Sequence, residues 1–199
     1  MPGFDCDRFI DDAFGAHAAL VAATREAVRA PLARLVELAA RAVEQGGKIL
    51  FFGNGVSAGV AQQLAAALTV RQRESRAPIA ALALSSNSAT LTAIGNALGF
   101  DQLFVRQIRA LGRRGDLAVG LCAAERSTNV TLGLEAARNV GLVPAAFTGS
   151  DGGDLAGIAD PLLMVPSDDG ARILEMHVTI GQIFCAALER RLGLVRDPA

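Results

Sequence analysis

Two segments of this chain each combine an apolar run of strand length, a glycine-rich turn and the start of a helix. Residues 48–52 are followed by Gly-Asn-Gly-Val-Ser at 53–57, and residues 142–148 by Gly-Ser-Asp-Gly-Gly at 149–153. In a parallel α/β sheet such turns lie at the carboxyl ends of the strands, where ligands bind. Free N–H groups at the start of the next helix favour an anion there. The pattern therefore predicts a site for a small anionic ligand, with phosphate as the leading candidate.

The rest of the chain alternates between expected strands and helices. Apolar patterning predicts strands at 48–52, 79–84, 117–121, 143–147 and 162–165, and helices at 57–72, 90–97, 101–111, 127–140 and 170–192. Strands separated by helices of this length favour a parallel sheet with right-handed crossovers. We therefore predict an α/β fold, a three-layer α-β-α sandwich.

The N-terminal region is expected to form a helical hairpin. Apolar residues recur at helical spacing on both sides of Pro31, which suits the first turn of a second helix, and Gly46-Gly47 suits its end. We predict a hairpin over residues 1–46 that forms one structural unit with a domain at 47–199. Its apolar stripe, and that of the last helix, favour oligomerisation through helices.

Composition excludes several classes of function. With 19 basic and 20 acidic residues, the net charge of −1 is not the electrostatic footprint of a protein that binds nucleic acid directly. No run approaches about 18 uninterrupted apolar residues, so no membrane span is expected. The first residues lack the features of a signal peptide, which predicts a cytoplasmic location. Three scattered cysteines and two histidines form no ligand spacing, so we expect neither a metal nor a cofactor.

Four motifs stand in an order that resembles a known family. They are Gly-Asn-Gly-Val-Ser-Ala at 53–58, Ala-Ile-Gly-Asn-Ala-Leu-Gly-Phe at 93–100, Thr-Gly-Ser-Asp-Gly-Gly at 148–153 and Arg-Ile-Leu-Glu-Met-His at 172–177. Their spacing resembles that of sugar isomerase (SIS) domain proteins of the phosphoheptose isomerase type, over essentially the whole chain. The resemblance implies a five-stranded parallel sheet of flavodoxin-like topology and a homotetramer with ligand sites at subunit interfaces.

Within that family, the chain looks most similar to the DiaA group, whose members are not isomerases and bind the replication initiator DnaA. The likeness rests on the segments at 54–58, 61–62 and 106–112 and on the run at 175–177. It implies a DnaA-type initiator protein as a partner.

The resemblance also places a phosphate-binding loop at residues 122–127. In the isomerases this loop is rich in hydroxyls, whereas here it reads Cys-Ala-Ala-Glu-Arg-Ser. Ser127 and Thr128 are the hydroxyls that remain, and Glu125 puts a negative charge where a phosphate should bind. A solvated loop that Ser127 caps is the alternative interpretation.

The acid, base and metal positions of the isomerases have changed in this chain. The resemblance places them at Gln63, Ala67, Ala97, Leu174 and Gln182. Alanine and leucine cannot transfer protons, and two glutamines make a poor zinc site. These losses predict no catalytic residue, no metal ligand and no aldose–ketose isomerase activity. The polar groups and turn residues that we expect to bind a ligand are Asn54, Gly55, Ser57, Gln63, Asn96, Ser127 and Thr128.

The two histidines are both expected to be structural or interface residues. Glu175 and His177 lie two positions apart on an expected helix and point in different directions, so they cannot act as a unit. His17 lies among alanines in the N-terminal region. Asp168-Asp169-Gly170 reads as the N-terminal cap of the last helix.

Three hypotheses for function follow. The leading one is a catalytically degenerate SIS-domain tetramer that binds a sugar phosphate, DnaA or both. The alternative is a phosphoheptose isomerase that converts sedoheptulose 7-phosphate to D-glycero-D-manno-heptose 7-phosphate. The third is a small ligand-binding regulator with no role in replication.

Overall fold

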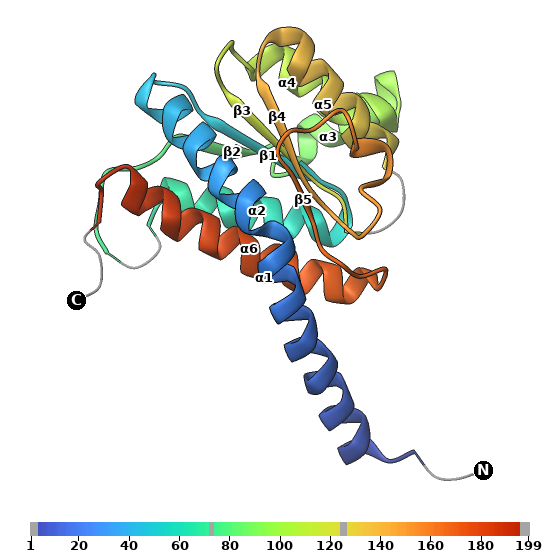
Figure 1. Ribbon diagram of the computed structural model, residues 1–199. Coiled ribbons are helices and arrows are strands. Elements are labelled where there is room, and N and C mark those ends of the chain that lie inside the picture. Colours follow the sequence, from blue (N-terminus) through green and yellow to red (C-terminus); the bar gives the residue numbers. More distant parts are fainter. Residues whose placement is uncertain (1–3, 72–73, 124–126, 196–199) are drawn as a thin grey trace.

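The computed structural model describes residues 4–71, 74–123 and 127–195 and contains one five-stranded parallel sheet. The strand order is β2-β1-β3-β4-β5, with every neighbouring pair parallel. The strands are β1 Ile49–Gly53, β2 Ala81–Ala83, β3 Leu117–Leu121, β4 Val143–Thr148 and β5 Leu162–Met164. The predicted parallel sheet and its flavodoxin-like topology are confirmed (Figure 1).

Six α-helices surround the sheet in the described part of the chain. They are α1 Cys6–Glu44, α2 Gly55–Thr69, α3 Ser88–Leu98, α4 Leu103–Leu111, α5 Thr128–Val140 and α6 Gly170–Arg191, with 3₁₀ turns at Phe100–Gln102 and Gly153–Leu155. One core cluster packs α1, α2 and α6 against the sheet, and the other packs α3, α4 and α5. The predicted three-layer sandwich is therefore confirmed.

Successive side chains of a strand point to opposite faces of the sheet, so the core consists of one cluster on each face. In β1, Phe51 belongs to the first cluster and contacts Phe184 edge-on, with ring centroids 6.4 Å apart. Its neighbour Phe52 points to the other face and lies 5.0 Å from the ring of Phe104. Because both faces are covered, the central strands β1 and β3 are buried along their whole length.

The N-terminal region forms one continuous helix, so the predicted helical hairpin is wrong. Pro31 lies inside α1, which runs from Cys6 to Glu44. Proline removes one backbone donor and disfavours a helix interior. Here Val28 and Leu35 are buried on either side of Pro31, so tertiary packing keeps the helix continuous at this position.

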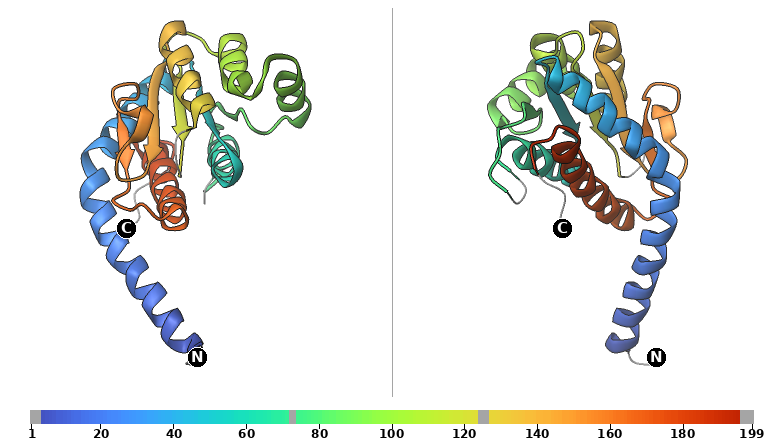
Figure 2. Two further views of the ribbon diagram at one scale, coloured as in Figure 1. Left: turned by 90° about the vertical axis from the view of Figure 1, so that its right-hand side faces the viewer. Right: turned by 60° about the vertical axis from the view of Figure 1, so that its left-hand side comes forward.

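Figures 1 and 2 show that the first half of α1 projects away from the sandwich. The second half packs against α6 and β5. The projecting half carries large exposed apolar side chains, Phe9, Ile10, Phe14 and Val21. This part of the helix therefore presents an apolar surface that the other described residues leave exposed.

Helix α6 meets the length and composition criteria of a membrane-spanning helix, the only one in the described ranges that does so. Core helices pass the same test, and Met176, Ile180, Phe184 and Leu188 of α6 are buried in the first core cluster. The finding is weak evidence for a span.

Close packing of α6 on α2 depends on a glycine. A Cβ atom at Gly181 would lie 2.5 Å from Cδ2 and 2.9 Å from Cδ1 of Leu64, which is fully buried. Alanine at this position would have to displace a core side chain or separate the two helices.

We expect Gly181→Ala to lower the free energy of unfolding by about 1–3 kcal/mol because it overpacks the α2–α6 contact. The matched control is Gly59→Ala, a helical position with no heavy atom within 4 Å of the added Cβ. The control should raise stability by about 0.5–1 kcal/mol through helix propensity. Urea unfolding at fixed protein concentration measures both, and equal effects would contradict the packing argument.

Candidate functional site

The strand order reverses between β1 and β3, and this point lies at the carboxyl edge of the sheet. Strand order 2-1-3-4-5 has its topological switch point there, where ligands bind in open α/β sheets. Helix α2 begins directly after β1, and α5 begins after β3. The N-termini of both helices therefore flank the same crevice.

Hydrogen bonds between two asparagines join the two sides of this crevice. Asn54 Nδ2 donates to Asn129 Oδ1 at 2.8 Å, and Asn129 Nδ2 donates to Asn54 Oδ1 at 2.9 Å. A Cβ atom on the adjacent Gly53 would lie 2.7 Å from the carbonyl oxygen of Leu121, so only glycine fits at this strand end. The chain then enters α2 through Gly55, whose φ of +52° favours glycine.

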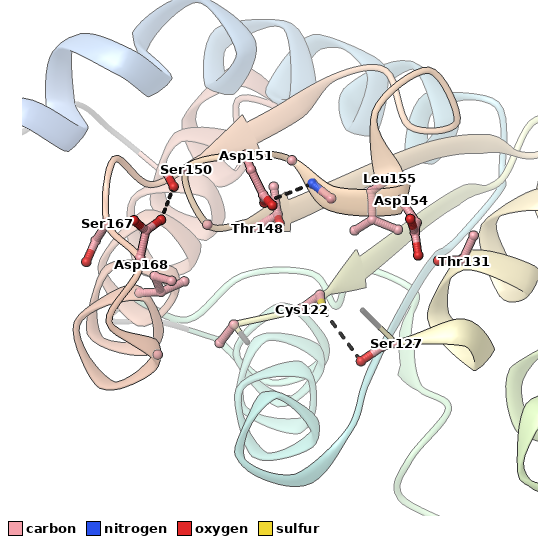
Figure 3. Close-up of a pocket in the computed structure, with 16 residues that line it drawn as sticks. Cys122, Ser127, Thr131, Thr148, Ser150, Asp151, Asp154, Leu155, Ser167 and Asp168 are labelled. Carbon is pink, nitrogen blue, oxygen red and sulfur yellow. Dashed lines mark hydrogen bonds between the residues drawn. The ribbon is translucent and has the colours of Figure 1, made fainter. Parts of the chain in front are cut away.

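A cavity of about 730 Å³ opens at the carboxyl edge beside α5, and we call it the sheet-end cavity. Three segments line it: residues 122–131 across the gap at 124–126, residues 148–155 after β4, and residues 167–173 at the start of α6 (Figure 3). Its described hydroxyls are those of Ser127, Thr131, Thr148, Ser150 and Ser167.

The described lining of the sheet-end cavity contains three carboxylates. Asp151, Asp154 and Asp168 line it, and no basic side chain is found among its described lining residues. Ser150 Oγ donates to Asp168 Oδ1, and Asp151 Oδ1 accepts from the backbone N–H of Gly153 at 3.0 Å. Carboxylates and hydroxyls suit the hydroxyls of a sugar, and backbone N–H groups at the start of α5 can donate to an anion.

A second cavity, of about 620 Å³, lies between the C-terminal halves of α2 and α6, and we call it the outer-groove cavity. It brings together Gln63, Ala67 and Gln182, three of the five positions that the resemblance assigns to acid, base and metal. Leu174 and Ala97 do not line it. Its charged lining residues are Arg71, Glu74, Glu189 and Arg190.

A buried ion pair forms one wall of the outer-groove cavity. Arg76 Nε donates to Glu189 Oε1 at 2.7 Å, and the two side chains are 0% and 3% exposed. The same guanidinium donates to the carbonyl oxygens of Ala67, at the end of α2, and Ala77. These bonds satisfy the buried charges and hold the chain after α2 against α6.

The residues of the outer-groove cavity do not fit the zinc ion that the resemblance implies. Carboxamide side chains and Ala67 replace the expected ligands, and zinc prefers thiolate, imidazole and carboxylate ligands. Across the described ranges, no group of three histidine, cysteine or acidic side chains lies close enough to hold a metal.

The histidines occupy two different environments. Within the described structure, His177 is fully buried, donates from Nε2 to the carbonyl oxygen of Thr148 at 3.3 Å and leaves Nδ1 without a partner. Burial lowers the pKa of His177 to about 4, so the ring is neutral at pH 7. His17 donates from Nδ1 to Glu175 Oε2 at 2.7 Å and so ties α1 to α6. Glu175 thus pairs with His17 and with Arg172, at 2.6 Å, and not with His177.

The predicted ligand residues do not form one cluster. Ser127 lines the sheet-end cavity, Gln63 lines the outer-groove cavity, and Asn96 lies exposed on α3. The remaining predictions flank the crevice at the helix starts: Asn54, Gly55, Ser57 and Thr128. Glu125, expected to weaken phosphate binding, lies outside the described residues.

Sequence reasoning missed the carboxylates of the sheet-end cavity. The glycine-rich turn at 149–153 marked the place, but Asp151 and Asp154 were not recognised as lining residues. Asp168 was interpreted as part of a helix cap. That cap is confirmed, since Asp169 accepts from the backbone N–H groups of Ala171 and Arg172.

Comparison with known proteins gives consistent matches over the chain. The SIS domain family matches residues 14–149. A phosphoheptose isomerase of Paramagnetospirillum magneticum is 50% identical over 181 residues, 91% of this chain and 94% of that protein. The phosphoheptose isomerase of Aliarcobacter butzleri is 39% identical over 180 residues, 90% of this chain and 95% of that protein.

Solved structures give the same result. Phosphoheptose isomerase GmhA from Neisseria gonorrhoeae superposes with a TM-score of 0.87 at 34% identity, over 94% of this chain and 100% of that chain. A phosphoheptose isomerase from Francisella tularensis gives a TM-score of 0.86 at 30% identity, also over 94% and 100%.

These matches contradict the leading hypothesis of a catalytically degenerate scaffold that binds a replication initiator. The two relatives and the two solved structures described above carry the name of the enzyme, which supports the alternative hypothesis. The hypothesis rested on five altered positions. The outer-groove cavity also holds carboxylates and guanidinium groups that the motifs did not reveal.

We expect the neutral state of His177 to make stability depend on pH. Its folded pKa of about 4 lies below the ordinary value of 6.5, so between these values the unfolded chain binds a proton that the native state does not. Stability from this group is therefore complete above about pH 6.5 and falls by about 3 kcal/mol as the pH drops to 4. Urea unfolding of wild type and His177→Leu across this range measures it. Parallel pH profiles of the two proteins would contradict the assignment.

Proposed function

We propose that this chain, which belongs to the SIS domain family, is a phosphoheptose isomerase that acts on sedoheptulose 7-phosphate. The observation that carries the proposal is the 50% identity to a phosphoheptose isomerase over 91% of the chain. The product would be D-glycero-D-manno-heptose 7-phosphate. Two cavities of ligand size beside the helices that flank the switch point support a small-molecule substrate.

The sheet-end cavity is proposed to hold the substrate by its hydroxyls and its phosphate. Asp151, Asp154 and Asp168 accept hydrogen bonds from sugar hydroxyls, and Ser127 and Thr128 lie at the start of α5, where N–H groups can donate to phosphate oxygens. Asn54, Gly55, Ser57, Gln63 and Asn96 remain proposed ligand residues.

The reaction itself needs a base and a group that polarises a carbonyl. Ketose-to-aldose isomerisation moves a proton between adjacent carbons through an enediol. Alanine at positions 67 and 97 and leucine at 174 cannot do this, so the base must be another side chain of this protein.

We also propose a homotetramer in the cytoplasm. The support is the exposed apolar side of the projecting part of α1, which a second copy of the chain would cover. The packing of α6 inside the core supports the location. Ligand sites at subunit interfaces, which the resemblance implies, belong to the same proposal.

We expect purified protein to convert sedoheptulose 7-phosphate to the aldose with a turnover number of about 1 s⁻¹ or more, an ordinary rate for an enzyme. NMR of the sugar carbons follows both isomers directly. Unphosphorylated sedoheptulose is the matched control and should react far more slowly, because the phosphate contributes binding energy. Absence of product from the phosphorylated substrate would overturn the proposal.

We expect light scattering at micromolar concentration to give a mass of about four times 20.6 kDa, because obligate interfaces of this kind bury more than about 2,000 Å². The double variant Phe9→Glu and Phe14→Glu should shift the mass to smaller species. Phe100→Glu is a control that is equally exposed and lies far from α1 in the sequence. A wild-type mass of one chain would rule out the tetramer.

A further inference from the structure

A buried histidine of α6 reaches the end of β4, at the wall of the sheet-end cavity. His177 is 0% exposed, and its Nε2–H donates to the carbonyl oxygen of Thr148 at 3.3 Å. Its ring also contacts Phe147 edge-on, with ring centroids 5.7 Å apart. Thr148 is the last residue of β4 and lines the cavity in which the substrate is proposed to bind. His177 does not line this cavity, so any effect on a ligand there passes through Thr148.

The carbonyl oxygen of Thr148 is a point at which three elements meet. It accepts the backbone N–H of Val165, the residue after β5, at 2.9 Å, in addition to the imidazole N–H from α6. The next residue, Gly149, packs closely on α6, because a Cβ atom there would lie 2.8 Å from Cδ1 of Ile173, one turn before His177. The end of β4 is therefore fixed to the end of β5 and to α6 at the same place.

Hydrogen bonds extend this junction along the cavity. The backbone N–H of Ser150 donates to the carbonyl oxygen of Ser167 at 3.2 Å, and Ser150 Oγ donates to Asp168 Oδ1 (Figure 3). Residues 148–150 and 167–168 thus form one joined wall, which we call the hydroxyl wall, and none of them belongs to the gap at 124–126. Its hydroxyls and its carboxylate are groups that can hydrogen-bond to a sugar.

Core packing does not explain a histidine at this position. A carbonyl oxygen only accepts, so the ring proton lies on Nε2 and Nδ1 is an acceptor, which has no partner among the described residues. A buried acceptor without a donor destabilises the native state, whereas a leucine would fill similar space without that cost. The hydrogen bond to Thr148 is the feature that a leucine at position 177 could not provide.

We propose that His177 is a positioning residue for the isomerisation, whose hydrogen bond to Thr148 holds the hydroxyl wall in the shape that binds the sugar. This inference rests on the proposed function. Without the Nε2 donor, the junction between the wall and α6 relies on the packing of Gly149 against Ile173. A looser wall must be ordered when the sugar binds, which weakens binding in the ground state and the transition state alike. The loss should therefore appear in KM and not in kcat.

The variants His177→Leu and His177→Gln test the assignment as a pair. Leucine removes the donor, whereas the carboxamide of glutamine carries N–H groups that can replace Nε2–H. For sedoheptulose 7-phosphate, we expect KM of His177→Leu to rise about three- to tenfold at nearly unchanged kcat, the factor that one neutral hydrogen bond represents. His177→Gln should recover most of this loss. Hydrogen exchange of peptides that cover 148–153 and 165–168, followed by mass spectrometry, should be faster in His177→Leu than in wild type.

The matched control is Phe184→Leu, which disturbs the same helix two turns further on, where Phe184 is fully buried against Phe51. It should lower the urea midpoint and leave both KM and the exchange of the hydroxyl wall at wild-type values.

Unchanged KM in His177→Leu, with wild type active, would overturn the inference and leave the proposed function standing. An equal rise in KM in Phe184→Leu would also overturn the inference, because loss of stability alone would then account for the effect. Wild-type exchange of the hydroxyl wall in His177→Leu would overturn it whatever the activity. An inactive wild type would overturn both the inference and the proposed function.

Discussion

The reciprocal hydrogen bonds between Asn54 and Asn129 hold the carboxyl edge of this sheet in one geometry. Each carboxamide donates to and accepts from the other, at 2.8 and 2.9 Å, and Asn129 is 1% exposed. Loss of Asn54 would leave the buried amide of Asn129 unsatisfied, which costs about 1–3 kcal/mol. Because the pair joins the residue before α2 to the second residue of α5, it fixes how the N-termini of the two helices lie relative to each other. Everything proposed for the ligand at this edge depends on that arrangement.

The two cavities differ in the charge of their described lining residues. The described lining of the sheet-end cavity has three carboxylates and no basic side chain, whereas the outer-groove cavity has two arginines and two glutamates. A sugar with many hydroxyls suits the first environment. The second environment is held by the buried ion pair between Arg76 and Glu189.

Local patterns in the sequence predicted the sheet and most of the helices. The strand at 117–121 and the helix starting at 170 agree with the structure, because each is a strong apolar pattern bounded by polar or glycine residues. The hairpin around Pro31 failed, because packing of Val28 and Leu35 decides that region and propensity does not. The same limit applies to the site. His17 and Glu175 are 158 residues apart, and no spacing rule connects them.

The hypothesis of a catalytically degenerate scaffold was wrong because it judged the capacity for catalysis from five positions alone. Those positions hold Gln63, Ala67, Ala97, Leu174 and Gln182, and only three of them come together in the fold. A cavity is defined by all the side chains that line it, including those from segments that no motif marks. Arg71 and Glu74 follow α2 in the sequence, and they line the same cavity as Gln63 and Gln182. Loss of a base at one position therefore says little about the reaction until the whole cavity has been considered.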